Sequence, residues 1–195
     1  MNSGGVLFVV TGPSGSGKDS LINWLRPHFA SDPAMVFVRR AITRHDGGNE
    51  EHECVSTDVF EARKAAGAYA VTWDAHGLSY GIPSEVLSHT RSGGHAIMNG
   101  SRRALPAIAE VFADLQVINL QVTPDVLAAR LKQRGRESGE EISTRLARKA
   151  GAIPTCIMVT ELDNSGALDD AGHAALDIVA ARLSMIVGAQ KKAGA

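Results

Sequence analysis

Short runs of apolar, β-branched residues alternate along the chain with segments whose apolar residues recur every three or four positions. The first pattern predicts buried strands and the second predicts helices. Their alternation is typical of a largely parallel sheet covered by helices, so the sequence predicts an α/β fold. The expected core strands are Val6–Thr11, Ala96–Asn99, Val117–Val122 and Cys156–Leu162.

The helical segments carry recognisable start and stop signals. Thr123 is a natural N-cap, Pro124 then occupies the first helical position, and Gly135 follows the last. In the final helix the apolar residues recur at three- and four-residue steps, which indicates a face packed on the core. The expected helices are Asp19–Phe29, Ala104–Phe112, Pro124–Arg134 and about Leu168–Val187.

The stretch from about residue 36 to residue 92 has a different texture. Its strands are short, and one short helix begins at a Ser56-Thr57-Asp58 cap and ends at Gly67. These features predict a small strand-rich insertion. Beside a phosphate-binding loop, such an insertion is where a small kinase would hold its acceptor.

The run Gly12-Pro13-Ser14-Gly15-Ser16-Gly17-Lys18 follows the first expected strand and opens the first expected helix. It matches the phosphate-loop pattern G-x-x-x-x-G-K in the required context. A phosphate held there meets backbone N–H groups and the positive end of the helix dipole, and Lys18 can reach the terminal phosphates. The sequence therefore predicts binding of a nucleoside triphosphate.

Asp19 stands where the pattern expects the Ser or Thr that ligates Mg²⁺, and Ser20 follows one residue late. A carboxylate beside a triphosphate is repelled unless a metal ion intervenes. Asp19 therefore either has a role linked to Mg²⁺ or points away from the phosphates. We take Asp19 and Ser20 as the candidate Mg²⁺ ligands.

Composition limits the remaining function classes. A chain of 195 residues forms one domain with small appendages, and a formal net charge of −1 argues against nucleic acid or an anionic membrane as partner. Cys54 and Cys156 lack metal-ligand spacing, and no apolar run reaches the roughly 18 residues of a membrane span. The sequence predicts a cytoplasmic protein and leaves open whether it forms a homodimer.

A cluster of arginines brackets the glycines at positions 135 and 139, between two helical segments. Arginines that close over phosphates match the needs of phosphoryl transfer, so we predict a mobile lid at about residues 130–149. The alternative is a solvated, arginine-rich helix pair. The cluster consists of Arg130, Arg134, Arg136, Arg145 and Arg148.

Two further basic groups are candidates for binding an acceptor. If residues 36–42 form one strand, Arg39 and Arg40 point to opposite faces, and one of them is structural. Arg44 belongs to the same group. Arg102 and Arg103 follow the strand that ends at Asn99, at the edge where open α/β sheets place ligands.

Over nearly its whole length the chain resembles the guanylate kinase family. The resemblance rests on the phosphate loop, Thr43-Arg44, the helix Asp58–Gly67, Tyr80-Gly81, the Arg130–Arg148 segment and Asn164. The chain departs from that family where guanine is read. Ile82-Pro83 replaces hydroxyl residues, Asn99 stands where the family has Asp, and the guanine-reading Glu falls near Val71 or Thr72, so GMP is a poor acceptor.

A closer resemblance is to the ribose 1,5-bisphosphate phosphokinase family, which acts in phosphonate degradation. The shared motifs are the phosphate loop with Asp19, the segment from Arg39 to Arg44, Trp73, the segment from Ala75 to Leu78, Tyr80-Gly81-Ile82-Pro83 and Asn99-Gly100-Ser101-Arg102. The resemblance implies transfer of the ATP γ-phosphoryl group to the 1-phosphate of ribose 1,5-bisphosphate. The products would be 5-phospho-α-D-ribose 1-diphosphate and ADP.

The resemblance also implies residue roles. Lys18 and the amides from Ser14 to Lys18 would hold the ATP phosphates, with Mg²⁺ at Asp19 or Ser20. Arg134, Arg136 and Arg145 would close over the transferring group. The acceptor candidates are Arg40, Arg44, His76, Tyr80, Ser101 and Arg102; His76 and Trp73 could equally be packing residues.

Two alternatives remain at this point. One is a guanylate kinase or another nucleoside monophosphate kinase. The other, of a different class, is an inactive guanylate-kinase-like interaction module, against which the intact Gly17-Lys18 pair and the arginine cluster weigh.

Overall fold

The computed structural model describes residues 4–44, 51–134, 153–155 and 157–193. The chain forms a five-stranded parallel sheet of order β2-β7-β1-β8-β9 and a four-stranded mixed sheet of order β4-β3-β6-β5. The predicted parallel α/β sheet is therefore confirmed. The first sheet consists of β1 (Leu7–Thr11), β2 (Met35–Phe37), β7 (His95–Asn99), β8 (Leu115–Gln121) and β9 (Met158–Asp163), and the second of β3 (Ala41–Ile42), β4 (Glu53–Cys54), β5 (Tyr69–Ala75) and β6 (Leu78–Pro83).

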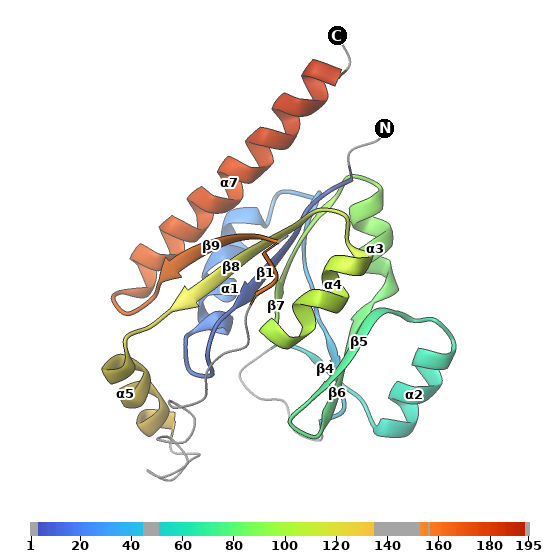
Figure 1. Ribbon diagram of the computed structural model, residues 1–195, viewed down its shortest axis with the longest axis horizontal. Helices are drawn as coiled ribbons and strands as arrows, with labels where there is room; N and C mark the ends of the chain where they lie inside the picture. Colours follow the sequence, from blue (N-terminus) through green and yellow to red (C-terminus); the bar gives the residue numbers. More distant parts are fainter. Residues whose placement is uncertain (1–3, 45–50, 135–152, 156, 194–195) are drawn as a thin grey trace.

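Helices cover both faces of the first sheet (Figure 1). One face packs on α1 and α7, and the other packs on α3 and α4. Helix α2 lies against the second sheet, and α5 follows β8. The helices are α1 (Lys18–Leu25, continued by the 3₁₀ turn η1, Arg26–Phe29), α2 (Thr57–Ala65), α3 (Ser84–Arg91), the turn η2 (Arg102–Ala104) with α4 (Leu105–Val111), α5 (Pro124–Arg134) and α7 (Leu168–Ala193).

Strand β1 shows why the chain forms a sheet buried on both faces. Phe8 and Val10 pack into the cluster shared with α1 and α7, whereas Leu7 and Val9 pack into the cluster shared with α3 and α4. All four side chains are fully buried. An uninterrupted apolar run is what a central parallel strand requires, because its successive side chains point to opposite faces.

Residues 36–42 do not form one strand, contrary to the expectation from their apolar pattern. Strand β2 ends at Phe37 in the first sheet, and β3 begins at Ala41 in the second. Arg39 and Arg40 lie in the crossing segment between the sheets. The apolar pattern continues across this change of sheet because β2 is partly buried and β3 is fully buried, so the pattern alone does not mark the break.

Helix α3 was not among the predicted helices. It begins directly after Pro83, carries Glu85 in its first turn, and buries Val86 and Thr90. At eight residues the helix is shorter than the stretch of sequence over which helical periodicity is read, which accounts for the miss. The other predicted elements are present with shifted ends, and α5 has the predicted bounds Pro124–Arg134.

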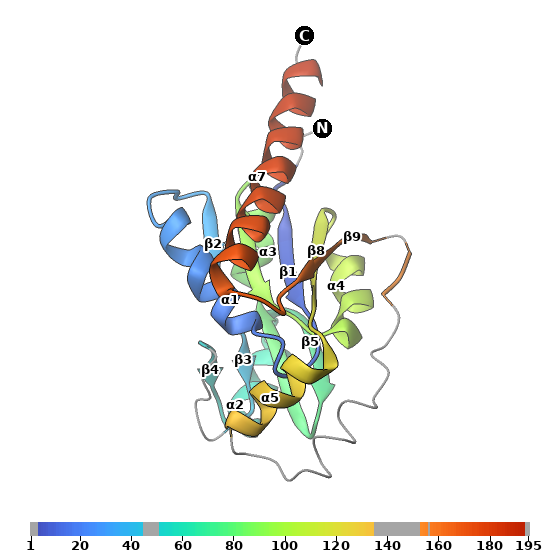
Figure 2. The same ribbon diagram turned by 90° about the vertical axis from the view of Figure 1, so that its left-hand side faces the viewer.

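One helix of the described chain, α7, is long and apolar enough over Leu168–Gly188 to cross a membrane. Its first half belongs to the core, because Ala171, Ala175 and Val179 pack with α1 and β1. A Cβ atom at Gly172 would lie 2.3 Å from the ring of Trp24, so the two helices approach closely there. Leu183 and Ile186 continue this packing, and only the C-terminal end of α7 extends past the body of the molecule (Figure 2).

The carboxyl ends of the first-sheet strands point toward the side of the molecule where α5 and the second sheet lie (Figures 1 and 2). The second sheet falls within the stretch predicted as the acceptor-binding insertion, about residues 36–92. The assignment of that stretch to the acceptor stays a prediction. Most of the predicted lid, residues 135–149, lies outside the described residues.

At the opposite edge of the first sheet, His95 begins β7. Its Nδ1 accepts a hydrogen bond from the Val6 N–H at 3.1 Å, which requires that nitrogen to be unprotonated. Burial is the main cause that lowers the pKa of His95; Asp32 opposes it, the nearby His89 adds to it, and Asp114 opposes it weakly. The neutral imidazole is therefore the form that stabilises the folded protein.

Because folded His95 binds a proton less readily than unfolded histidine, its stabilising effect is present above the unfolded pKa of about 6.5 and is lost as the pH falls toward the lower folded value. We predict that His95→Asn, whose side-chain oxygen can still accept from Val6, flattens the pH dependence of stability between pH 7 and pH 5. The effect is bounded by about 1.4 kcal/mol per pH unit. Urea unfolding at several pH values measures it, and equal slopes for the two proteins would contradict it.

Candidate active site

The strand, glycine-rich loop and helix predicted from the sequence are present. Gly12, Gly15 and Gly17 have φ values of +149°, +87° and +87°, in the region that favours glycine. Gly17 caps α1, and its carbonyl accepts from the Leu21 N–H at 2.9 Å. The loop therefore wraps around the N-terminus of a helix, where backbone N–H groups and the helix dipole favour an anion.

Lys18 bends back along this loop. Its ammonium donates to the Gly12 carbonyl at 3.1 Å and to the Pro13 carbonyl at 2.9 Å. These bonds fix a positive charge at the start of the loop, close to the amides of the helix N-terminus. The arrangement concentrates cationic character on one short segment, as binding of a polyphosphate requires.

Asn164, the residue after β9, holds the phosphate loop in place through a side-chain hydrogen bond. It is buried, its Nδ2 donates to the Ser16 carbonyl at 2.6 Å, and its backbone N–H donates to Gln121 at 2.8 Å. A Cβ atom at Gly17 would lie 2.6 Å from the same Nδ2. Glycine at position 17 is thus required both by its φ and by this close contact.

A cavity of about 320 Å³ adjoins the loop. Arg130 of α5 contributes a buried Nη1 that has no hydrogen-bond partner among the described residues. The buried Oδ1 of Asn164 also has no hydrogen-bond partner among the described residues. Within the described part of the chain, a cavity with an unpaired cation and an unpaired acceptor in its wall suits a ligand that carries both anionic and donor groups. It is lined by Gly15, Gly17, Ser20, Arg130, Gln133, Asn164 and Leu168.

Asp19, in the first turn of α1, points to the end of β7. Its Oδ1 accepts a hydrogen bond from Asn99 Nδ2 at 2.6 Å. Ser20 is exposed beside it and lines the cavity. A carboxylate and a hydroxyl next to a phosphate loop form the oxygen-rich donor set that Mg²⁺ prefers, since Mg²⁺ is commonly held by one or two carboxylates plus substrate phosphates. The residues present therefore fit this ion.

Arg102 lies at the same edge of the sheet, in the turn that follows β7. Its Nε and Nη2 donate to Oδ1 of the buried Asn119 at 3.1 and 2.9 Å. Ser101 precedes it and caps the turn, because its Oγ accepts from the Arg103 N–H at 3.2 Å. The guanidinium of Arg102 is therefore held in place, whereas Arg103 is exposed.

Arg40 and Arg39, in the segment between the two sheets, have different surroundings. Arg40 is 5% exposed, and its guanidinium lies over the rings of Trp73 and Tyr80 at 5.7 and 5.5 Å from their centroids. The two rings stack on each other at 5.2 Å and 7° between planes. Trp73 also packs against the cluster under α3 and α4. Arg40 and Tyr80 thus belong to one ordered stack.

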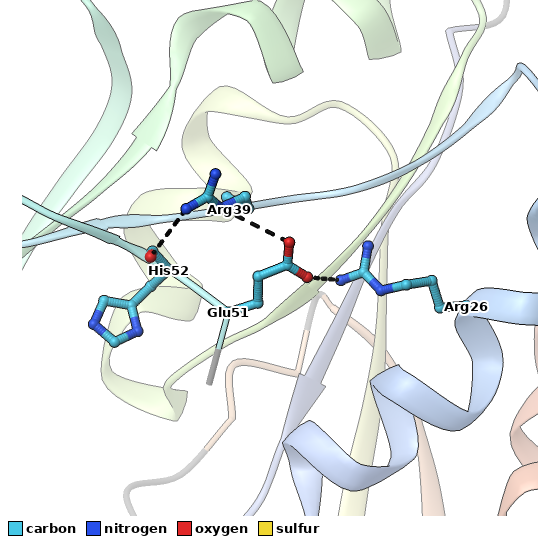
Figure 3. A network of polar contacts seen from close by, with 4 residues as sticks. All are labelled: Arg26, Arg39, Glu51 and His52. Atoms are coloured by element: carbon cyan, nitrogen blue, oxygen red, sulfur yellow. Dashed lines mark hydrogen bonds and ion pairs between the residues drawn. The ribbon is translucent and has the colours of Figure 1, made fainter. Parts of the chain in front are cut away.

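Arg39 instead faces the start of β4 (Figure 3). It donates to the His52 carbonyl at 3.4 Å and lies 3.9 Å from the carboxylate of Glu51, which also pairs with Arg26. The Arg26 guanidinium in turn lies 4.7 Å over the Phe37 ring. Arg39 therefore takes part in a structural link between η1 and the second sheet.

The structure does not gather all the predicted acceptor residues. Arg44 is exposed at the end of β3, directly before residues that are not described. His76 is exposed in the β5–β6 turn, where its φ of +55° and the +73° of Gly77 fit a tight hairpin. In the described part of the chain, His76 makes no hydrogen bond or ion pair, so its observed role is in the turn.

The arginine cluster expected to close over the phosphates is described only in part. Arg130 lines the cavity. Arg134 ends α5, and its side chain is outside what the structure describes, as are Arg136, Arg145 and Arg148. Their predicted roles stay predictions.

Three further residues shape this site: sequence reasoning placed Arg130 in the predicted lid cluster, named Asn164 only as part of a resemblance, and gave Asn119 no role. Arg130 stands one helical turn before Arg134, which is a signal for the same face of α5. Asn164 follows the end of a strand, where ligand-binding residues gather. Asn119 is a polar residue near the end of an otherwise apolar strand, but only the fold reveals what it contacts.

The chain is similar to known kinases in sequence. It is 46% identical to the ribose 1,5-bisphosphate phosphokinase PhnN of Agrobacterium fabrum over 174 residues, covering 89% of this chain and 95% of that protein. It is 47% identical to the protein of the same name from Rhizobium etli, covering 86% and 85%. No protein-family model matches the chain.

Solved structures show the same fold. Guanylate kinase from Anaplasma phagocytophilum has a TM-score of 0.56 at 16% identity, covering 93% of this chain and 88% of that one. A gluconokinase from Sinorhizobium meliloti has a TM-score of 0.54 at 17% identity, covering 96% and 97%. These identities are low, so the likeness concerns the fold alone.

The contact between Gly17 and Asn164 leads to a stability prediction. Gly17→Ala combines a left-handed backbone strain of about 1 kcal/mol with a steric clash, so we expect a loss of about 2 kcal/mol or more in the free energy of unfolding. Gly67→Ala is the matched control, because Gly67 has a φ of +73° and nothing within 4 Å of the added Cβ.

Removing the clashing amide separates the two contributions. In an Asn164→Ala background, Gly17→Ala should cost no more than Gly67→Ala does, as measured by urea unfolding. An unchanged cost of Gly17→Ala in that background would show that the Asn164 contact does not constrain position 17.

Proposed function

The chain belongs to the ribose 1,5-bisphosphate phosphokinase family, and on that premise we propose that it transfers the ATP γ-phosphoryl group to the 1-phosphate of ribose 1,5-bisphosphate. An oxygen of the 1-phosphate forms a bond to the γ-phosphorus, and the bond from that phosphorus to the β–γ bridging oxygen breaks. The products are 5-phospho-α-D-ribose 1-diphosphate and ADP. The observation that supports this proposal most strongly is the high sequence identity over most of both chains. The phosphate loop also has the glycine conformations that the motif requires.

The ATP phosphates occupy the loop in this proposal. Amides from Ser14 to Lys18 donate to them at the helix N-terminus, and the Lys18 ammonium exchanges its carbonyl partners for phosphate oxygens. Charge-assisted bonds to phosphate are stronger than bonds to neutral carbonyls, which favours that exchange. The adjoining cavity, with Arg130 and Asn164 in its wall, receives the rest of the nucleotide.

Asp19 and Ser20 would hold Mg²⁺ through oxygen ligands. When bound, Mg²⁺ offsets negative charge on the transferring phosphates. Asn99 supports this arrangement because its amide orients the Asp19 carboxylate without neutralising it. A bond from a neutral amide leaves the charge of Asp19 available to the ion.

The acceptor requires cations more than it requires a base. A phosphate monoester is already ionised near neutral pH, so its oxygen attacks without loss of a proton to the protein. The protein's task is to position the reactants and to stabilise charge. We assign acceptor binding to Arg102 at the carboxyl edge of the first sheet and to Arg40 with Tyr80 on the second, with Arg44, His76 and Ser101 as further candidates.

The fold likeness to guanylate kinase does not favour GMP as the acceptor, since it extends only to the fold at 16% identity. The phosphate loop favours an active kinase over an inactive interaction module. Closure by Arg134, Arg136 and Arg145, the cytoplasmic location and a homodimer stay predictions from the sequence.

We predict that ribose 1,5-bisphosphate is phosphorylated in preference to GMP and AMP when each is incubated with MgATP. Product formation and ADP release are followed together by ³¹P NMR. Lys18→Ala should remove transfer while leaving the fold intact, because this loop charge acts on the phosphates rather than on the core. GMP turning over faster than ribose 1,5-bisphosphate would restore the guanylate kinase alternative.

A second prediction concerns Asp19. Asp19→Asn keeps a group that can accept from Asn99 but removes the negative charge, so the Mg²⁺ concentration for half-maximal activity should rise by about tenfold. Calorimetric titration of Mg²⁺ into the protein with ADP provides a readout independent of turnover. Glu85→Gln, in the first turn of α3, is the charge-matched control. Unchanged Mg²⁺ dependence in both assays would assign Asp19 to the helix terminus alone.

A further inference from the structure

Three neighbouring strands of the first sheet carry a polar side chain at the same level near their carboxyl ends. Thr11 of β1 stands beside Asn119 of β8, and Asn119 stands beside Glu161 of β9. Their side chains are joined in a row: Thr11 Oγ1 donates to Asn119 Oδ1 at 3.0 Å, and Asn119 Nδ2 donates to Glu161 Oε2 at 2.7 Å. Thr11 and Asn119 are buried.

The row has only one consistent orientation of the Asn119 amide. A carboxylate accepts hydrogen bonds and cannot donate, so the NH₂ group must face Glu161. Its oxygen is then directed to the other side, where Thr11 and two N–H groups of Arg102 donate to it. Gln121 donates to the same Glu161 oxygen and fixes the carboxylate. The acidic residue thus sets which way Asn119 faces.

The row holds the Arg102 guanidinium in place without neutralising its charge. A guanidinium has five N–H donors, of which two bond to Asn119, and the other three have no partner within the described residues. The two bonded N–H groups donate to the neutral amide oxygen of Asn119. The carboxylate of Glu161 lies on the other side of that amide and makes no ion pair with the guanidinium. A carboxylate in direct contact would instead neutralise the guanidinium.

The row also fixes where this charge stands relative to the phosphate loop. Thr11 is the residue before Gly12, and its hydroxyl shares the acceptor oxygen with Arg102. Two donors that each lie about 3 Å from one oxygen are within about 6 Å of each other. The Arg102 guanidinium is therefore held next to the start of the loop, beside Thr11 of β1 and Asn119 of β8.

We propose that Asn119 is a positioning residue for phosphoryl transfer: through the Thr11–Asn119–Glu161 row it presents Arg102, with its charge intact, to a phosphate of the acceptor. The proposal rests on the proposed function, because Arg102 is assigned there to acceptor binding. It adds that a neutral residue at position 119 is required, and that the acidic residue of the row must stand one place further away, on β9.

The direct test moves the carboxylate by one place. The double variant Asn119→Asp with Glu161→Gln keeps the net charge of the wild type, and the amide introduced on β9 can donate to the carboxylate introduced on β8. That carboxylate would now pair directly with Arg102 and neutralise its charge. We expect the acceptor KM to rise by about tenfold or more, with the ATP KM and the thermal midpoint near their wild-type values.

The same double variant made in an Arg102→Ala background separates positioning from structure. If Asn119 acts through Arg102, the double substitution at positions 119 and 161 changes the acceptor KM no further once Arg102 has been replaced by Ala. An equal further rise in that background would show that the row only supports the sheet, and would overturn the inference.

A variant outside the core keeps the inference testable if the Asn119→Asp, Glu161→Gln double variant does not fold. Arg102→Lys retains the charge but lacks the fork that bonds twice to Asn119. It should raise the acceptor KM nearly as much as Arg102→Ala does, and wild-type values for Arg102→Lys would overturn the inference.

The wild-type protein separates this inference from the proposed function. If the wild type fails to use ribose 1,5-bisphosphate but transfers to another phosphorylated acceptor, the proposed acceptor is wrong and the same comparison is made with that acceptor. The exchange of the Arg102 Nε–H proton with solvent, followed by NMR, needs no acceptor at all. We expect slow exchange in the wild type and fast exchange in Asn119→Ala; equal rates would contradict the positioning.

Discussion

Three asparagine side chains at or near the carboxyl ends of strands β7, β8 and β9 of the parallel sheet hold the parts of this site in place. Asn99 at the end of β7 binds the Asp19 carboxylate, Asn119 of β8 binds the Arg102 guanidinium, and Asn164 after β9 binds the Ser16 carbonyl of the phosphate loop. Each contact is a hydrogen bond from or to a neutral amide. The site is therefore ordered by groups that leave its charges available to a ligand.

This arrangement follows from the fold. Parallel strands end at one edge, so residues far apart in sequence meet there, and the buried body of the sheet keeps their positions rigid. A kinase must bring together groups that are all negatively charged, and it needs cations that are neither mobile nor already paired. Amide partners hold such cations in place and leave them unpaired with an anion, because a neutral amide fixes the geometry of a charged group without neutralising its charge.

The sequence predicts the elements of the site better than its contacts. The loop from Gly12 to Lys18 and the bounds of α5 are readable because glycine, proline and capping residues act locally. The break between β2 and β3 is not, since apolar residues continue through a change of sheet. The roles of Asn119 and Asn164 depend on neighbours at least 17 residues away in the chain, and no local pattern encodes them.

The central claim is that phosphoryl transfer occurs along the carboxyl edge of the first sheet, from the phosphate loop toward Arg102. A crystal structure with a bisubstrate analogue, in which the ATP phosphates are joined to ribose 5-phosphate, tests it most directly. The account predicts that the donor phosphates lie against the amides from Ser14 to Lys18 and that a phosphate of the sugar half lies within hydrogen-bonding distance of Arg102. A sugar half bound elsewhere, with Arg102 still engaged only by Asn119, would contradict it.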